Sequence, residues 1–296
     1  YPGIRSDSDM YTLGFPFRPW RGATSIAAGE EIRAYIRETA LEYGVTERIH
    51  HGQRVERLEW SSDTARWTVT AHTASGEVQH TARLVYLATG YYAYESGHVV
   101  GFPGQEDFAG PVVHPQAWPD GIPVAGSRIV VIGSGATAVT LLPALVEAGA
   151  AHVTMLQRSP GYVASVPSRD PVALRLSTVL PDAVAHRVVR AKNVALSTAG
   201  YQVLRRYPDA GRRLLRRRME QALPPGYPVD THFAPRYDPW DQRLCVAADG
   251  DLFDVLGSGR AEVVTASIER FESDGIRLTS GEHLPADVIV TATGLR

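Results

Sequence analysis

An uncharged stretch from Ile129 to Val146 limits what this chain can fold into more than any other feature of the sequence. It begins with apolar residues, continues through Gly133-Ser134-Gly135-Ala136-Thr137-Ala138, and ends with apolar residues at helical spacing. A membrane-spanning helix needs about 20 predominantly apolar residues, whereas this stretch contains two glycines, a proline and three hydroxyl side chains. A strand, a tight turn and a helix explain it better, so we expect no transmembrane segment here.

The segments around this turn have the pattern of a parallel βαβ unit, with a strand at 127–132, a helix at about 136–148 and a strand at 152–157. The sequence therefore predicts an α/β fold. The other expected elements are a helix at about 30–43 with Ser25 as its cap, and a hairpin or meander at 54–60 and 67–72. We also expect buried strands at 84–88 and 287–292, strands at 261–271 and 276–278, and several helices within 168–223, broken at Pro181 and Pro208.

The glycine-rich turn has the residues that a dinucleotide requires. Gly133 and Gly135 permit a tight turn and a close approach of the backbone to a pyrophosphate, and Ala138 is small enough for close helix–strand packing. The N–H groups at the start of the helix and the helix dipole favour a bound anion. We therefore predict that residues 133–137, namely Gly133, Ser134, Gly135, Ala136 and Thr137, bind a nucleotide.

The end of the second strand selects between the two nicotinamide cofactors. An NAD site usually has Asp or Glu about 20 residues after the turn, where it binds the ribose 2′-hydroxyl. This chain has Gln157-Arg158-Ser159 there. The Arg158 guanidinium can hold a 2′-phosphate and the Ser159 hydroxyl can add a hydrogen bond, which favours NADP(H).

Upstream of the turn, Phe108, Gly110, His114, Trp118 and Pro119 spell F-x-G-x-x-x-H-x-x-x-W-P. A histidine and a tryptophan in a loop are by default packing and hydrogen-bonding residues. We interpret His114 and Trp118 as residues of a hinge that fixes a linker between two cofactor domains.

Residues 1–14, 133–141 and 154–160 are most similar to the actinobacterial ethionamide-activating group of the Baeyer–Villiger monooxygenases, flavin enzymes that insert oxygen beside a carbonyl. The pattern at 108–119 and four further segments resemble the same family. Those segments are Tyr1-Pro-Gly-Ile-Arg-Ser-Asp7, Leu87-Ala-Thr-Gly90, Thr291-Ala-Thr-Gly294 and Pro239-Trp-Asp-Gln-Arg-Leu-Cys245. The resemblance implies FAD and NADP(H) as cofactors, with Thr89, Gly90, Thr293 and Gly294 in the two cofactor turns.

The resemblance also implies a reaction. NADPH reduces FAD, the reduced flavin takes up O2 as a C4a-peroxyflavin, and one oxygen atom goes to a ketone, a sulfide or an amine. Arg243 matches the active-site arginine of the family, and Asp7 is expected to hold that arginine in place. Gln242 stands where the family often has a lysine that helps to bind the 2′-phosphate, which weakens the expected preference for NADP.

The resemblance gives the fold class as a two-dinucleotide-binding-domain flavoprotein. We expect a partial FAD domain at 1–121, with a linker at about 91–127, and a Rossmann-like NADP domain at 122–296, with a helical insertion at about 165–225. No N-terminal GxGxxG for FAD is present, so we expect the chain to be a piece of a longer protein, inactive alone and weak or lacking in FAD binding.

Two other classes of function remain open. The first is a flavin monooxygenase that oxygenates nitrogen or sulfur without Baeyer–Villiger activity, and the second is an inactive nucleotide-binding homologue. Flavin disulfide reductases need paired thiols, and Cys245 is the only cysteine. A single cysteine also argues against a cysteine-rich metal site and favours a reducing compartment, so we expect no metal and a cytoplasmic location.

Charge gives little sign of a macromolecular partner. The net charge of −2 provides no global attraction to nucleic acid or to an anionic membrane. The basic group Arg212, Arg213, Arg216, Arg217 and Arg218 could bind phosphate or a membrane. We interpret it instead as a solvated helix face, with Leu214 and Leu215 on a buried stripe.

Overall fold

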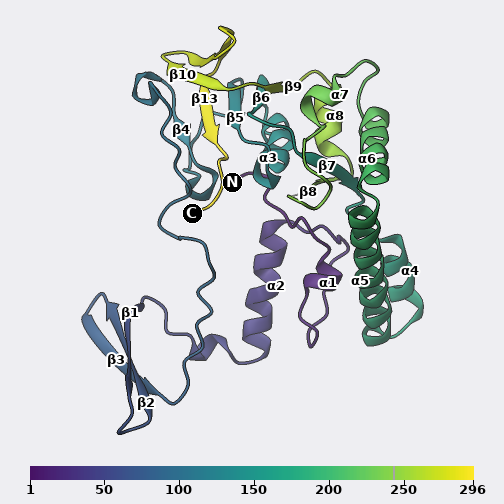
Figure 1. Cartoon of the computed structure of the whole chain (residues 1–296). Helices are drawn as coiled ribbons and strands as arrows, with labels where there is room; N and C mark the ends of the chain where they lie inside the picture. The colour runs from purple at the N-terminus through teal and green to yellow at the C-terminus, as the bar shows by residue number, and fades with distance from the viewer. Residues whose placement is uncertain (243) are drawn as a thin grey trace. The chain divides into compact units, whose positions relative to one another are not determined.

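The computed structural model describes residues 1–242 and 244–296 (Figure 1). These residues form two compact units, one of Tyr1–Ile32 with Ala93–Arg296 and one of Arg33–Tyr92. The predicted Arg243 lies outside the described residues.

The centre of the first unit is a parallel sheet of five strands in the order β4-β13-β5-β6-β9. Helix α3 connects β5 to β6, which confirms the predicted βαβ unit and the α/β fold. Because neighbours in this sheet come from distant parts of the sequence, the carboxyl ends of separate motifs meet at one edge. The bounds are β4 (Val112–Val113), β5 (Arg128–Ile132), α3 (Ala136–Glu147), β6 (His152–Gln157), β9 (Ala261–Thr265) and β13 (Val288–Thr291).

Alternate residues of β5 enter two different cores, as the period of a strand requires. Ile129 and Val131 pack with α3 and with α8 (Asp251–Gly257), whereas Val130 and Ile132 pack beneath a small antiparallel sheet. That sheet consists of β10 (Ile268–Glu272), β11 (Gly275–Leu278) and β12 (His283–Pro285). The central sheet is therefore covered on both faces, which explains its continuous apolar strands.

The predicted helical region is confirmed between β6 and β9. Proline occupies the first turn of α4 and of α6, where its missing N–H is not needed, and Pro181 is the N-cap of α5. Among the described helices, none combines the length and the apolar character needed to cross a membrane. The bounds are β7 (Tyr162–Val166), α4 (Pro171–Val179), α5 (Asp182–Arg206), α6 (Pro208–Ala222), α7 (Val229–His232) and β8 (Leu244–Ala248), with β7 and β8 paired in parallel.

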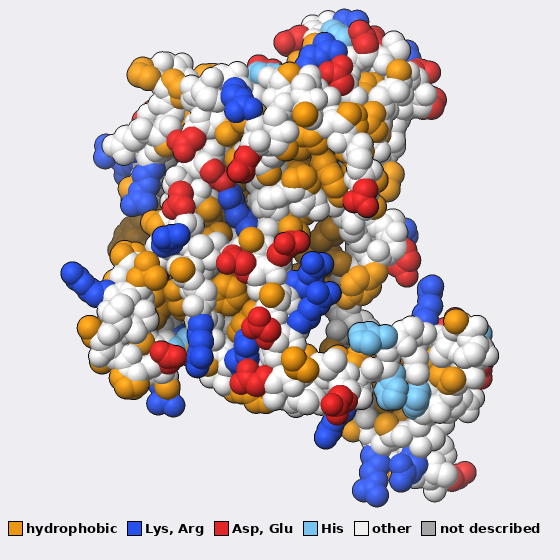
Figure 2. Space-filling model, turned by 180° about the vertical axis from the view of Figure 1, so that it is seen from behind, with side chains coloured by type: hydrophobic (Ala, Val, Ile, Leu, Met, Phe, Trp, Pro, Cys, Tyr) orange, Lys and Arg blue, Asp and Glu red, His pale blue; other side chains and the backbone are white. Residues whose placement is uncertain are grey.

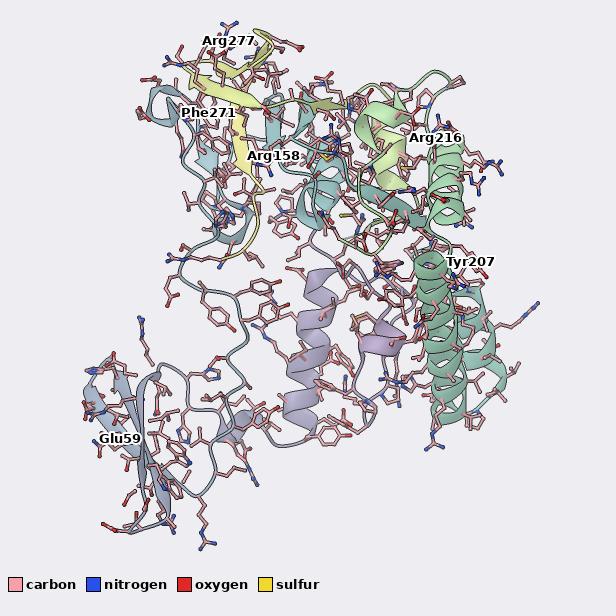
Figure 3. All side chains as sticks on the ribbon, in the orientation of Figure 1. Glu59, Arg158, Tyr207, Arg216, Phe271 and Arg277 are labelled. Carbon is pink, nitrogen blue, oxygen red and sulfur yellow. The ribbon has the colours of Figure 1, made fainter. Side chains whose placement is uncertain are left out.

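The arginine-rich helix α6 has its buried stripe on Leu215 and Met219. Leu214 is 48% exposed, so its predicted place on that stripe is wrong; it lies one residue away from the i, i+4 line of buried positions. Arg216, labelled in Figure 3, donates to both carboxylate oxygens of Asp230 at 2.8 Å. Figure 2 shows acidic and basic side chains interspersed on the face drawn there.

The N-terminal segment of the first unit contains α1 (Met10–Leu13) and the start of α2 (Gly29–Glu42). Asp9 caps α1 by accepting from the Thr12 N–H at 2.9 Å. Ser25 does not cap α2 as predicted, because the helix begins four residues later and the Ser25 hydroxyl donates to the carbonyl of Ser168. The linker contains two 3-10 turns, η2 (Gln105–Asp107) and η3 (Pro115–Ala117).

The second unit is an antiparallel meander of β1 (Arg54–Ser61), β2 (Arg66–Thr73) and β3 (Gly76–Ala82), preceded by η1 (Thr46–Arg48). The sequence predicted a hairpin or a meander here, and the structure has the meander, with β3 as its third strand. The buried strand predicted at 84–88 is wrong, since Leu84 and Leu87 are 81% and 67% exposed and no strand is formed there. A buried strand needs a neighbouring strand and a covering layer, and no described strand pairs with this segment.

Candidate nucleotide-binding site

The turn after β5 has a backbone that only glycine adopts easily. Gly133 has a φ of +136°, and its N–H donates to the carbonyl of Leu156 at 2.9 Å. A Cβ at this position would lie 2.4 Å from the carbonyl oxygen of Ala292 on the β13 side. The glycine therefore holds the ends of β5, β6 and β13 together, as the sequence predicts for a dinucleotide turn.

The start of α3 is arranged to receive an anion. A Cβ built on Gly135 meets no atom within 4 Å, so the backbone here faces open space. Among the described residues no side chain caps this helix, and its first turn contains no acidic residue. Ala138 is fully buried and lets the helix lie close to the sheet. The N–H groups of the first turn can therefore bind a phosphate, with the helix dipole in support.

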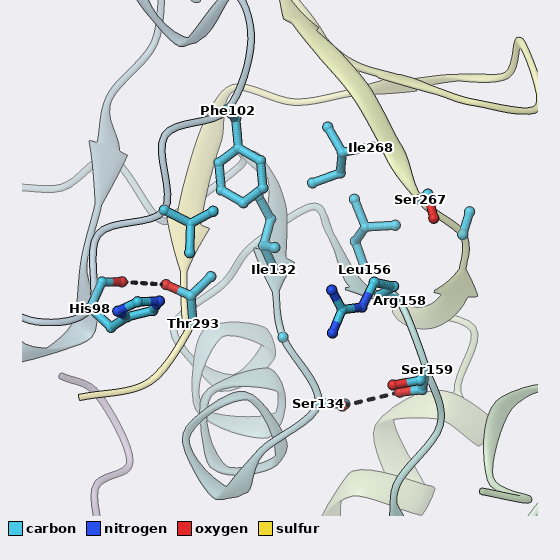
Figure 4. Close-up of a pocket in the computed structure, with 13 residues that line it drawn as sticks. His98, Phe102, Ile132, Ser134, Leu156, Arg158, Ser159, Ser267, Ile268 and Thr293 are labelled. Carbon is cyan, nitrogen blue, oxygen red and sulfur yellow. Dashed lines mark hydrogen bonds between the residues drawn. The ribbon is translucent and has the colours of Figure 1, made fainter. Parts of the chain in front are cut away.

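A cavity of about 510 Å³, which we call the nucleotide cavity, opens beside this turn (Figure 4). Arg158 extends from the end of β6 into it, and Ser159 and Ser134 lie at its edge, where the Ser134 hydroxyl donates to the Ser159 carbonyl at 3.3 Å. The cavity is within the range of about 300–1,000 Å³ that small-molecule sites occupy. The structure thus brings together Gly133, Ser134, Arg158, Ser159 and Thr293, all of which the sequence predicts as cofactor-binding residues.

The walls of this cavity contain residues that the sequence did not indicate. Phe102 from the linker and Ile268 from β10 face Ile132 and Leu156 (Figure 4), and together they form an apolar surface suited to a flat heterocycle. His98 lines the same cavity, and its carbonyl accepts from the Thr293 hydroxyl at 2.7 Å. These residues belong to segments whose patterns predict only a loop and a strand, so their convergence depends on the tertiary fold.

A second cavity of about 390 Å³, which we call the linker cavity, is lined by residues of the linker, of the first turn of α3 and of the segment after β13. It joins four predicted motifs, since Tyr1, His114, Thr137 and Gly294 all line it. Burial raises the pKa of the Tyr1 phenol, and a hydrogen bond with the Thr137 side chain opposes that rise. The N-terminal motif therefore reaches the first turn of α3, next to the place expected for a phosphate.

His114 is fixed by two hydrogen bonds. Its Nδ1 accepts from the Gln116 N–H at 3.2 Å, which places the ring proton on Nε2, and Nε2 donates to the carbonyl of Gly294 at 3.1 Å. A Cβ on Gly97 would come within 1.9 Å of the His114 ring, so linker and ring are in close contact. The arrangement ties the linker to the turn after β13.

The other fingerprint residues have packing positions. Phe108 is buried in the core under the small antiparallel sheet, edge-on to Phe271 with ring centroids 6.4 Å apart. Gly110 lies against the backbone at the start of β13, where a Cβ would come within 2.3 Å of the Asp287 carbonyl oxygen. Trp118 is partly buried against the α3 core.

The remaining predicted residues are not gathered in these cavities. Asp7 and Gln242 are exposed, and Thr89 and Gly90 belong to the second unit. The expected contact between Asp7 and Arg243 lies outside the described residues, because Arg243 does. No sequence motif indicated a role for Arg5, whose guanidinium makes a bidentate ion pair with Asp251 at 2.5 and 3.1 Å and anchors the N-terminal motif to α8.

Comparison with known proteins identifies the family. A protein-family profile described as "Pyridine nucleotide-disulphide oxidoreductase" matches residues 19–199. The FAD-containing monooxygenase EthA of Mycolicibacterium smegmatis is 52% identical over 295 residues, which cover 100% of this chain and 60% of the relative. The chain thus spans about 60% of the length of the curated relatives it matches.

Two solved structures share the fold. A steroid monooxygenase bound to NADP superposes with a TM-score of 0.78 at 23% identity, covering 100% of this chain and 63% of that chain. A cyclohexanone monooxygenase bound to epsilon-caprolactone gives a TM-score of 0.79 at 19% identity, covering 100% and 65%.

The chain belongs to the pyridine nucleotide-disulphide oxidoreductase family. Within it, the sequence relatives are FAD-containing monooxygenases of the EthA and MymA type, so the predicted resemblance is confirmed. The family description mentions a disulphide, but the sequence has one cysteine, Cys245, which is buried.

Proposed function

We propose that the chain binds NADP(H) across the glycine-rich turn. The observation that carries this proposal is the position of Arg158, whose guanidinium extends into the nucleotide cavity beside a helix N-terminus that no described side chain caps. A guanidinium there recognises the 2′-phosphate that distinguishes NADP from NAD. No carboxylate is present among the described residues that line the cavity, so none opposes that phosphate.

The lining of the nucleotide cavity and of the linker cavity suggests how the dinucleotide lies. We assign the adenosine half to the nucleotide cavity, against Phe102 and Ile268, and the pyrophosphate to the N–H groups at the start of α3. The nicotinamide end then extends toward the linker cavity, where Tyr1 and His114 face the turn after β13. His114 orients that turn through Gly294 and does not exchange protons in this scheme.

We propose FAD as a cofactor of the whole protein, in which the flavin would activate O2. Of the described residues, the N-terminal motif fits a role beside it, since Arg5 and Tyr1 fix this segment against α8 and α3. Thr89 and Gly90 form no strand-end turn in this structure. Arg243 would place a permanent positive charge close to the negative charge that develops during the reaction. Asp7 would position the Arg243 side chain.

We infer that the whole protein is an NADPH- and FAD-dependent monooxygenase that transfers one oxygen atom of O2 to a small molecule. The names of the EthA relatives and the fold shared with steroid and cyclohexanone monooxygenases support this reading. Ketone insertion and oxidation at sulfur or nitrogen are both compatible with it. The cytoplasmic location expected from cysteine usage is part of the same proposal.

Calorimetric titration of NADP+ and NAD+ into the chain tests the nucleotide assignment. Replacing Arg158 with Ala should weaken NADP+ binding about tenfold or more and change NAD+ binding less than threefold, because only the 2′-phosphate loses its partner. Arg175→Ala, on the exposed surface of α4, is the matched control and should leave both affinities unchanged. Equal losses for the two nucleotides would refute the assignment.

A further inference from the structure

A third cavity, of about 250 Å³, lies between the N-terminal segment and the helical insertion, away from the glycine-rich turn. Its lining comes from two stretches, residues 11–23 around α1 and residues 173–189 on α4 and α5, and none of these residues belongs to the nucleotide or linker cavities. We call it the His186 cavity, after the histidine of α5 that lines it.

The two walls of this cavity are fastened to each other. Arg190 on α5 donates to the carbonyl oxygens of Tyr11, Thr12 and Gly14 at 3.2, 2.5 and 3.2 Å, and so binds the C-terminal end of α1. One turn further along α5, Asn193 donates to Asp9 at 2.9 Å. A cation and an amide thus hold α1 against α5, and the cavity beside them is part of a fixed packing arrangement.

Among the residues that line this cavity, His186 is buried and has an unpaired polar side chain. Its side chain belongs to a residue that is only 8% exposed, and neither ring nitrogen has a hydrogen-bond partner among the described residues. Burial, with a contribution from Arg190, lowers the pKa of His186, so the ring offers one N–H donor and one acceptor nitrogen. Such groups are rarely left unpaired in a protein interior, because they lose their hydrogen bonds to water without replacing them.

The other polar atoms around the cavity are already engaged. The Tyr11 hydroxyl donates to the Gly22 carbonyl at 3.2 Å, the Trp20 indole N–H to the Thr24 carbonyl at 2.9 Å, and the Ser177 hydroxyl to the Leu174 carbonyl at 2.9 Å. These side chains therefore present mainly ring and aliphatic surface to the cavity. The charged residues Arg21 and Asp182 also line it, but they are largely exposed and form an ion pair at 3.5 Å.

We propose that the His186 cavity binds a small neutral molecule with an apolar body and one hydroxyl group, about the size of a substituted phenol. A hydroxyl both donates and accepts, so it can satisfy either nitrogen of the imidazole, and the aromatic walls receive the body. The cavity is smaller than the roughly 300–1,000 Å³ of drug-sized sites, which limits the ligand. An ion would lose its hydration without gaining a buried counter-charge.

Titration of 4-propylphenol into the 296-residue chain, followed by calorimetry, tests this site. Saturable binding with one molecule per chain is expected. Propylbenzene, which has the same body without the hydroxyl, should bind at least tenfold more weakly, as should 4-propylphenol to the His186→Phe variant, which keeps a ring and loses both nitrogens. His51→Phe, at an exposed histidine of the second unit, should bind like the unchanged chain.

Nitrogen NMR of the unchanged chain provides a readout if the His186→Phe variant fails to fold. The imidazole nitrogen signals of His186 should shift on titration, in step with the calorimetric saturation, while those of His51 stay in place. An absence of saturable binding would mean that the cavity takes only solvent and would overturn the proposal. Equal affinity for 4-propylphenol and propylbenzene, or unshifted His186 signals, would also overturn it.

Discussion

The tripeptide Ala-Thr-Gly occurs twice in this chain, and its two copies have very different surroundings. At Ala292-Thr293-Gly294 it follows the central strand β13, and the linker binds it through the His98 carbonyl and the His114 ring. At Ala88-Thr89-Gly90 it follows an apolar run of the same kind, yet that run is exposed and forms no strand. Both glycines have positive φ, +105° and +71°, so local backbone preference is alike at the two sites.

The difference shows that the motif depends on the sheet it joins. β13 lies between β4 and β5 and is covered on both faces, so its backbone groups are paired and its side chains are buried. The segment at 84–88 has no such neighbours among the described strands. An apolar run predicts a strand only where another strand completes its hydrogen bonds.

The largest expected effect is a difference in the free energy of unfolding between a substitution in β13 and one in the segment at 84–88. Ile289→Ala in β13 should reduce the free energy of unfolding by about 2–5 kcal/mol, because it leaves a cavity at a fully buried position. Leu87→Ala removes an exposed side chain and should change it by less than about 0.5 kcal/mol. Urea unfolding followed by circular dichroism measures both changes. Similar losses of stability would show that the segment at 84–88 is also packed.

Two glycine substitutions test the separate roles of Gly133 and Gly135 in the turn after β5. Gly133→Ala should destabilise the chain by about 1–3 kcal/mol, since its φ is positive and the new Cβ would press on the Ala292 carbonyl. Gly135→Ala meets open space, so it should barely change stability yet weaken NADP+ binding by crowding the phosphate. Thermal unfolding and NADP+ titration test the pair; unchanged NADP+ affinity in Gly135→Ala would contradict the assigned phosphate position.

The smallest expected effect on stability comes from Asp287, the residue directly before β13. Hydrogen bonds from the Arg128 side chain and backbone lower the pKa of Asp287 from 3.8 to about 2. Because the pKa falls on folding, this pair stabilises the chain above about pH 4, and that contribution is lost as the pH falls toward 2. Both side chains are partly exposed, so the gain should stay below about 1 kcal/mol.

Asp287→Asn should therefore be less stable than the unchanged chain at pH 6, with a difference that shrinks between pH 4 and pH 2. Urea unfolding at several pH values measures this difference. Asp63→Asn, in the exposed turn between β1 and β2, is the control and should show little difference at any pH. A deficit of Asp287→Asn that stays constant across this range would contradict the role of the carboxylate.

The sequence predicted the core of the fold and part of the site. The βαβ unit, the helical insertion and the expected roles of Gly133 and Arg158 follow from periodicity and turn chemistry, whereas Thr293 was expected only from the family resemblance. Two features did not follow. Phe102 and Ile268 reach the nucleotide cavity only through tertiary packing, and the strand expected at 84–88 failed because a pattern of apolar residues does not supply its partners.

We propose that the nucleotide site is complete within the first unit, whereas the flavin turn at Thr89 and Gly90 is not formed. Purification of the 296-residue chain with added FAD, followed by titration with NADP+, tests both halves in one preparation. We expect one NADP+ to bind per chain, much more tightly than NAD+, and little or no flavin absorbance to be retained. Stoichiometric, tightly held FAD, or an absence of NADP+ binding, would contradict it.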